Sequence, residues 1–186
     1  MKARTSLSRH AVVSLLVVPL LCVAAGAQEQ LGEAAARQLQ TQAEVCGRAF
    51  IEGDFERLAD CTVPKLVELM GGREKMIEAV RKDVEEMKAE GFEPLSSKHS
   101  APTQVVRVGS RTYAVIPLKF RMRSSKEVHV SDSFLIGVSG DGGQNWTFLS
   151  ADSTDEARMK VLLPDVVGKL KLPPARYSTE PLPARP

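Results

Sequence analysis

The stretch Tyr113-Ala114-Val115-Ile116-Pro117-Leu118-Lys119-Phe120-Arg121-Met122 decides the fold of this chain. Its even-numbered residues are all apolar, whereas its odd-numbered residues include Lys119 and Arg121. Alternation with a period of two predicts a strand with one face in a core and the other face nearer to water. Pro117 favours an edge position or a bulge, because proline cannot donate to the ladder of a central strand.

Strands are also predicted on both sides of this stretch. Residues 103–108 alternate weakly before the turn at Gly109-Ser110, and residues 127–139 form a long strand after it. The tight turn Gly140-Asp141-Gly142-Gly143 then leads into a last strand over residues 145–150. Four strands joined by short turns predict an antiparallel meander with helices covering one face.

The part of the chain before the meander is predicted to be helical. Asp54 suits the N-cap of a short helix, and Pro64 suits the first turn of another. The clearest helix covers residues 73–90, and a further short helix is expected around residues 155–161. The first helix has an apolar face whose residues recur every three or four positions. These residues are Leu31, Ala35, Leu39, Ala43, Cys46 and Phe50.

Residues 1–27 have the pattern of a cleavable secretory signal peptide. Three Lys and Arg residues precede an apolar run over residues 11–25, and no acidic residue occurs before Glu29. The small residues of Ala25-Gly26-Ala27 suit signal peptidase, which places the cut before Gln28. We therefore expect a secreted or periplasmic protein without a membrane segment after cleavage. A retained N-terminal anchor is the alternative.

Loss of residues 1–27 changes the net charge. The whole chain has 25 Lys and Arg against 23 Asp and Glu, a formal charge of +2. Removing Lys2, Arg4 and Arg9 leaves 22 against 23, a charge of −1, so nucleic acid is not expected as a partner. We expect a single domain over residues 28–172. The Pro-rich C-terminal tail over residues 173–186 is expected to be disordered or wrapped over the surface.

Two cysteines, Cys46 and Cys61, remain after removal of the leader. In an oxidising compartment an isolated pair is more often bridged than free, so a disulfide between them is predicted. Two buried, unpaired thiols are the alternative, which the spacing does not exclude.

Three helices followed by an antiparallel meander resemble the nuclear-transport-factor-2-like superfamily, the cystatin-like cone fold that includes the SnoaL-like proteins. The resemblance rests on Phe50-Ile51-Glu52-Gly53-Asp54-Phe55, on residues 64–70 before Gly71-Gly72, and on the hairpin over residues 139–148. It implies an α+β fold, with N-terminal helices packed on a strongly bent, cone-shaped sheet of four antiparallel strands. It also implies a pocket on the concave face and a possible homodimer through the sheet. Some members are isomerases, dehydratases or cyclases and many bind without catalysis, but no catalytic motif can be transferred residue by residue.

The residues Ser139, Asp141, Gly143 and Trp146 match the Asp-box pattern S-x-D-x-G-x-x-W, which is familiar from sialidases and other propellers. In such a box the Asp and Ser side chains bond turn amides, and the Trp packs beneath the hairpin. A propeller needs at least four blades, and this chain has one box and one meander. The box is therefore predicted to be structural and not a glycan site. Asp141 alone also supplies too few oxygen ligands for calcium.

Asp132 is the main candidate for a catalytic base, with His129 or Tyr113 assisting it. Simple alternation places Asp132 on the more apolar strand face, where burial would raise its pKa. The preferred alternatives are a bulge that moves Asp132 outward, or a bond to a neighbouring Lys or Arg. His99 is expected at the surface. No metal or other cofactor is expected, because the histidines are far apart and have no Cys or Glu at ligand spacing.

The lack of convergent polar residues favours a protein that is not a dedicated enzyme. We predict an exported domain that binds a small apolar molecule or a protein partner in an apolar pocket. The alternatives are a small acid–base enzyme of the isomerase or dehydratase type that uses Asp132, and a structural module that dimerises through the sheet.

Overall fold

The computed structural model of the chain describes residues 30–150 and 155–182. The predicted leader over residues 1–27 lies outside this described part. Within the described residues, no helix is long and apolar enough to cross a lipid bilayer.

Four helices form the first half of the described chain, and local signals set their ends. Gly53 has a φ of 76° and ends the first helix. Asp54 caps the second helix by accepting a hydrogen bond from the Arg57 amide at 3.0 Å. Pro64 begins the third helix, as its residue type predicts. The helices are α1 (Glu33–Glu52), α2 (Phe55–Cys61), α3 (Pro64–Leu69) and α4 (Arg73–Ala89).

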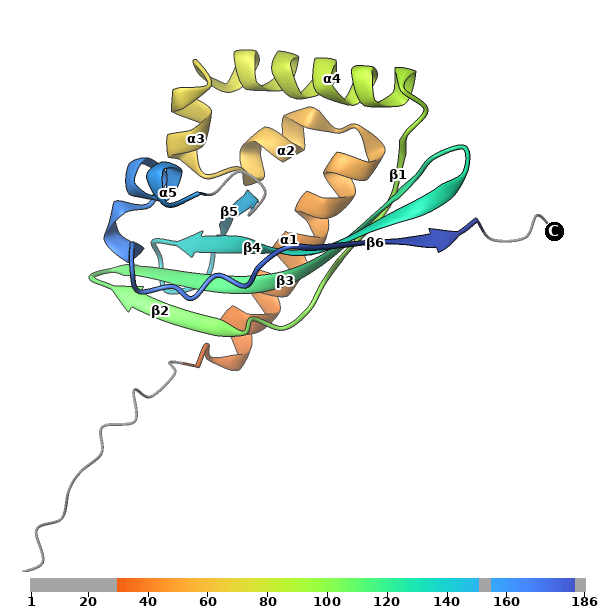
Figure 1. The fold of residues 1–186 in the computed structure, drawn as a ribbon. Helices are drawn as coiled ribbons and strands as arrows, with labels where there is room; N and C mark the ends of the chain where they lie inside the picture. The colour runs from red at the N-terminus through yellow and green to blue at the C-terminus, as the bar shows by residue number, and fades with distance from the viewer. Residues whose placement is uncertain (1–29, 151–154, 183–186) are drawn as a thin grey trace, which may run out of the picture.

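One antiparallel sheet follows the helices (Figure 1). Its strands are β1 (Glu93–His99), β2 (Gln104–Val108), β3 (Arg111–Arg123), β4 (Glu127–Ser139), β5 (Thr147–Ser150) and β6 (Arg176–Pro181). β3 and β4 pair at its centre from Thr112 opposite Ser139 to Arg123 opposite Val128. β1 and β2 share the far edge of β3, while β5 and β6 share the far edge of β4. The sheet curls into a half-barrel around α1, which confirms the α+β fold class.

The sheet has six strands instead of the four expected, because two polar edge strands were missed. β1 has the sequence EPLSSKH, which gives no clear apolar alternation. β6 lies in the segment expected to be disordered or wrapped over the surface. Its prolines do not prevent pairing, because Pro173 and Pro174 precede the strand and Pro181 ends it. An edge strand needs hydrogen bonds along only one side.

Pro117 lies in a central strand without a bulge, contrary to the expectation. Its carbonyl oxygen accepts a hydrogen bond from the Ser100 amide at 3.0 Å, so its nitrogen also faces the β1–β2 edge. At this point the neighbouring chain crosses from β1 to β2. The missing N–H therefore breaks no bond to β4, and Pro117 stays in register opposite Phe134.

Apolar clusters cover both faces of the sheet, where the sequence predicted a cover on one. α1 packs on the inner face, and its cluster contains Leu39, Ala43, Cys46, Val105, Ala114, Ile116, Leu135, Trp146 and Phe148. α5 (Glu156–Leu162) and the 3-10 helix η2 (Pro164–Val166) pack on the outer face. The outer cluster contains Val63, Tyr113, Val115, Phe134, Ile136, Leu149, Met159, Leu162, Leu163 and Val166.

The helical cover of the outer face ends halfway along the central hairpin. Residues 112–116 of β3 are all buried, whereas residues 117–123 are partly or fully exposed. We call residues 112–116 and 134–139 the covered half, and residues 117–133 the distal half. After η2 the chain crosses the outer face to reach β6 (Figure 1). We call this crossing segment, residues 168–175, the strap.

Candidate binding groove on the outer face of the sheet

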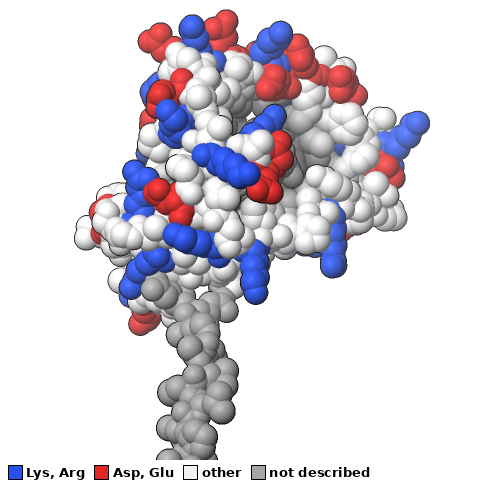
Figure 2. All heavy atoms as spheres, turned by 60° about the vertical axis from the view of Figure 1, so that its left-hand side comes forward, with Lys and Arg blue, Asp and Glu red and all other residues white. Residues whose placement is uncertain are grey.

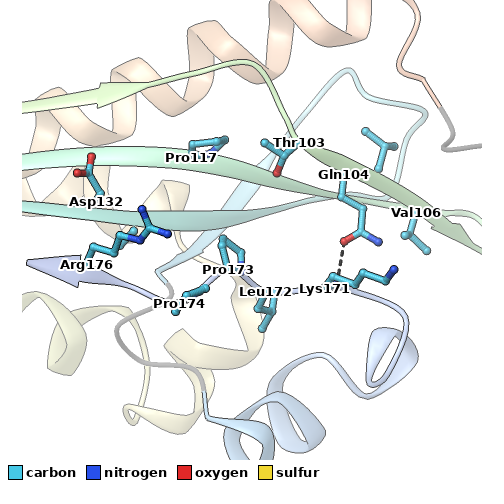
Figure 3. Close-up of a pocket in the computed structure, with 12 residues that line it drawn as sticks. Thr103, Gln104, Val106, Pro117, Asp132, Lys171, Leu172, Pro173, Pro174 and Arg176 are labelled. Carbon is cyan, nitrogen blue, oxygen red and sulfur yellow. Dashed lines mark hydrogen bonds between the residues drawn. The ribbon is translucent and has the colours of Figure 1, made fainter.

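A groove of about 820 Å³ lies on the outer face, between the sheet and the strap. Strands β2, β3 and β4 line one side of it, and the strap and the start of β6 line the other (Figure 3). Gln104 fixes the strap above β2 with two hydrogen bonds. Its side-chain nitrogen donates to the Lys169 carbonyl at 3.1 Å, and its side-chain oxygen accepts from the Lys171 amide at 2.8 Å. The groove is therefore bounded by two elements that are bonded to each other.

The middle of the groove is apolar and stiff. Pro117 on β3 lies across from Leu172, Pro173 and Pro174 of the strap (Figure 3). Val106 extends this apolar surface toward the β2 end. A proline ring fixes the backbone φ angle, so this wall has little conformational freedom to lose when a ligand binds.

Both ends of the groove carry charge: Lys171 lies at the Gln104 end, and an acidic and a basic lining residue lie at the other. Asp132 forms an ion pair with Lys119, whose Nζ lies 3.0 Å from Asp132 Oδ1. Both side chains are about half exposed. Arg176 pairs opposite Asp132 in the β4–β6 register, and Figure 3 shows its side chain directed toward that carboxylate. Two cations thus flank one carboxylate, and this end of the groove has a net positive charge.

Asp132 shares a strand face with Phe134 and Ile136, as alternation predicts, but it is not desolvated there. Phe134 lies opposite Pro117 at the border of the covered half, whereas Asp132 lies opposite Lys119 beyond it. The helices α5 and η2, which cover the outer face, do not extend over the Asp132–Lys119 pair. Of the positions expected for Asp132, the structure shows the one in which its carboxylate bonds a neighbouring lysine.

The three candidate catalytic residues are not brought to one place. His129 faces the inner side of β4, where its Nε2 lies 3.3 Å from Ser124 Oγ and its ring packs edge-on against Phe92 at 5.3 Å. Tyr113 is buried beneath η2, where its hydroxyl donates to Asp165 at 3.2 Å and burial raises its pKa. Tyr113 is six residues from Lys119, the cross-strand partner of Asp132, which is roughly 20 Å along a strand.

The Asp-box uses its polar groups inside its own turn. Asp141 accepts hydrogen bonds from the Asn145 backbone amide at 3.0 Å and from the Asn145 side chain at 2.7 Å. These bonds, together with one from the Ser139 hydroxyl, lower the pKa of Asp141 to about 2. Ser139 also accepts from the Gly143 amide at 2.9 Å, and the Trp146 indole donates to the Gly143 carbonyl at 3.0 Å.

The box is fixed to α1 by a residue that the sequence analysis missed. The Gln42 side chain donates to the Gln144 carbonyl at 2.8 Å and accepts from the Trp146 amide at 2.8 Å. Gly143 allows this close approach, because a Cβ there would lie 2.5 Å from that of Ala35. A glutamine in the polar sequence of a helix carries no local signal for such a role.

The two cysteines are neighbours in space. Their sulfur atoms lie 3.1 Å apart, between the inner side of α1 and the end of α2, and the structure has them as free thiols. The hydrogen bond between the thiols, together with burial, raises the pKa of Cys46. The same hydrogen bond lowers the pKa of Cys61, so Cys61 ionises more readily. The disulfide stays a prediction.

A second hollow, of about 480 Å³, lies between α1 and β1. His99 lines it and is partly buried, although the sequence analysis expected a surface position. Its ring lies against Gly47, where a Cβ would be 2.7 Å from His99 Cε1. Burial lowers the pKa of His99, and the nearby Glu44 partly offsets this effect.

The outer face of the distal half carries ion pairs between strands. Arg121 pairs with Glu180 on β6, and Arg123 pairs with Glu93 on β1. Val128 and Val130 are buried on this same face, which fits the ability of arginine stems to cover apolar surface. Figure 2 shows acidic and basic side chains interspersed over the visible face of the molecule. On this face the mixture leaves no broad surface of one sign for a polyanion.

Within the described residues, no group of three or more His, Cys, Asp or Glu side chains could hold a metal ion. No protein-family model, curated protein or solved structure matches this chain. The proposals below therefore rest on the geometry of this chain.

Proposed function

We propose that this protein is an exported, non-catalytic binding domain that holds a small, mostly apolar molecule in the groove beneath the strap. The observation that carries the proposal is the groove itself. Its apolar middle is built from prolines on two elements, and its more highly charged end is built from Asp132 and Arg176, with Lys119 bonded to Asp132 beside it. Concave, largely apolar sites with a few placed polar groups are the usual form of small-molecule sites.

The groove supports binding better than catalysis. Asp132 is the one lining residue that could act as a general base near neutral pH, because no histidine or cysteine lines the groove. Lys119 engages this carboxylate in an ion pair. Acid–base catalysis needs a second group positioned on the reacting atoms. His129 and Tyr113 lie elsewhere, so the isomerase or dehydratase alternative has no second catalytic group here.

The Asp132 end of the groove gathers more charge than the Gln104 end, where Lys171 is the one charged lining residue. Lys119 and Arg176 leave the Asp132 end with a net positive charge, which suits a carboxylate or sulfonate group. The apolar part of the ligand would lie over Pro117 and against Leu172. A linear molecule with one anionic end and an apolar body meets both requirements.

A titration with two probes tests this proposal. We expect dodecanoate and 8-anilinonaphthalene-1-sulfonate to bind with one site per chain in calorimetry, and dodecanol to bind more weakly than dodecanoate. Val106→Trp should fill the groove and weaken binding at least about tenfold, the effect of about 1.4 kcal/mol. Val161→Trp is the matched control, because Val161 is 52% exposed on α5 and does not line the groove.

Three results would contradict the proposal. They are no saturable binding of any probe to the folded wild-type protein, equal weakening by both Trp variants, and tight binding that survives Val106→Trp. Circular dichroism on each variant checks that the fold is retained.

Two broader parts of the proposal rest on the sequence. Export is supported by the basic, apolar and small-residue order of residues 1–27, and mass analysis of protein from the exporting cell should find a chain that begins near Gln28. Membership of the nuclear-transport-factor-2-like superfamily is supported by the order of helices and bent sheet. Intact Met1 on exported protein would rule out cleavage.

A further inference from the structure

The strand β6 has a regular outer edge. It pairs with β4 along its inner edge from Arg176 opposite Asp132 to Pro181 opposite Glu127, without a register shift. No strand of the described chain pairs with its outer edge. The opposite edge of the sheet differs, because β1 has a shift between Pro94 and Ser96 and gives way to β2. Bulges and interruptions of this kind protect an edge from further pairing, and β6 has neither.

The sequence of β6 is self-complementary in charge. Along Arg176-Tyr177-Ser178-Thr179-Glu180, the cation and the anion lie at equal distances on either side of Ser178. Alternation puts Arg176, Ser178 and Glu180 on one face. An antiparallel copy centred on Ser178 would place Arg176 opposite Glu180 of the partner subunit, and Glu180 opposite Arg176 of the partner subunit.

The ion pairs within the chain leave Arg176 able to pair with Glu180 of the partner subunit. Glu180 bonds Arg121 across β4. Within the described chain no carboxylate lies within ion-pair distance of Arg176. Tyr177 is 73% exposed on the same strand, the highest value among the exposed large apolar and aromatic residues of the described chain. Aromatic residues and arginine are enriched in protein interfaces.

We propose that two copies of this chain associate through antiparallel β6–β6 pairing about a two-fold axis at Ser178. The contact joins two six-stranded sheets into one. It is isologous, since each copy gives the same strand to the other. Because the shared strand has only six residues, the dimer is weak and forms reversibly with concentration.

Charge reversal tests this pairing with two complementary variants, so the result does not depend on a single variant being stable. Arg176→Glu opposes two carboxylates at each of the two symmetric contacts, and Glu180→Arg opposes two guanidinium groups there. Each variant alone should show a dimer dissociation constant at least about tenfold above that of the wild type. An equimolar mixture of the two variants should form a heterodimer, because both contacts again join opposite charges.

The measurement is sedimentation velocity over a range of concentrations at low and high salt, with Lys98→Glu as the matched control. Lys98 is exposed on β1 at the other sheet edge, so this variant should dimerise like the wild type. Raised salt should weaken the wild-type dimer, since exposed charges are screened. A monomeric wild type at every concentration, a dimer insensitive to Arg176→Glu, or a mixture without heterodimer would each overturn the proposal. Arg176 also lies at the more highly charged end of the groove, so the groove proposal is tested separately by Val106→Trp, which leaves β6 unchanged.

Discussion

The two halves of the central hairpin differ in what covers their outer face. The covered half lies between α1 on one side and α5 with η2 on the other, and Tyr113, Val115 and Ile116 there are at most 1% exposed. The distal half has no helix on its outer face and carries cross-strand ion pairs instead, such as Lys119 with Asp132. One pair of strands therefore provides both a two-sided core and an accessible surface.

This difference separates stability from recognition. Burial of apolar area is the dominant favourable term in folding, and it is concentrated in the covered half. Exposed ion pairs contribute little to stability, so the exposed charged side chains of the distal half can change with little loss of folding free energy. The groove lies at the border between the two halves, where rigid strands support a surface that a ligand can reach.

The largest difference should appear between an aromatic residue that packs on the covered half and one on the strand that pairs with the distal half. Trp146 is 4% exposed and packs on the inner-face core, so Trp146→Ala should lower the free energy of unfolding by about 3–5 kcal/mol. Tyr177→Ala on β6, opposite Ser131 of the distal half, should change it by less than about 0.5 kcal/mol. Urea unfolding at low protein concentration measures both. Equal losses would remove the distinction between the halves.

The next effect concerns the layer of helices on the inner face. Oxidation of Cys46 and Cys61 to a disulfide closes a loop between α1 and α2 and should stabilise the fold by roughly 3 kcal/mol. Protein isolated without reductant should be lighter by two hydrogens and should give a peptide that links the two residues. Two alkylatable thiols in freshly isolated exported protein would show that the pair stays reduced.

A smaller effect should follow from the Asp-box. The pKa of Asp141 is lowered to about 2 from its usual 3.8, chiefly by the bonds from Asn145, so the carboxylate stabilises the folded state fully above about pH 4. This contribution is lost as the pH falls through 2. Asp141→Ala should therefore be less stable than the wild type at pH 7, with a gap that narrows between pH 4 and 2. A gap that does not depend on pH would contradict this role.

The smallest effect is expected at Asp132. Its ion pair with Lys119 is half exposed, so Asp132→Asn should change the free energy of unfolding by less than about 1 kcal/mol. Neither form should show turnover in a screen for proton transfer on apolar carbonyl compounds. A variant that is more stable than an active parent, and is itself inactive, would instead support the enzyme alternative.

Periodicity in the sequence predicts the covered half well and the edges poorly. The strand 127–139 and the helix from Arg73 are predicted to within a residue, because buried faces impose regular apolar spacing. β1 and β6 were missed, since an edge strand with solvent on one side needs no such spacing. Pro117 is a misleading signal in the sequence for a related reason. Its missing N–H matters only on the side where a neighbouring strand needs it, and the order of strands is a tertiary property.

The site shows the same limit. The face on which Asp132 lies follows from alternation, but its pairing with Lys119 depends on the register between β3 and β4. The groove depends on where the strap crosses the sheet, and the bonds from Gln104 to Lys169 and Lys171 span more than sixty residues of sequence. Local patterns do not encode contacts of this kind. The Asp-box was recognised because the bonds among its own residues lie within one turn.

Hydrogen–deuterium exchange with and without dodecanoate is the most direct test of the central claim, that the covered half holds the fold while the groove beside it binds. Amides in residues 112–116 and 135–139 should exchange slowest, at the rate of global unfolding. This order should hold both without ligand and at low ligand occupancy. At saturation, added local protection should appear in residues 103–106 and 169–172, beyond the uniform slowing that any ligand of the folded state gives. Added protection confined to the hollow between α1 and β1, or none at either place, would contradict the assignment of the groove.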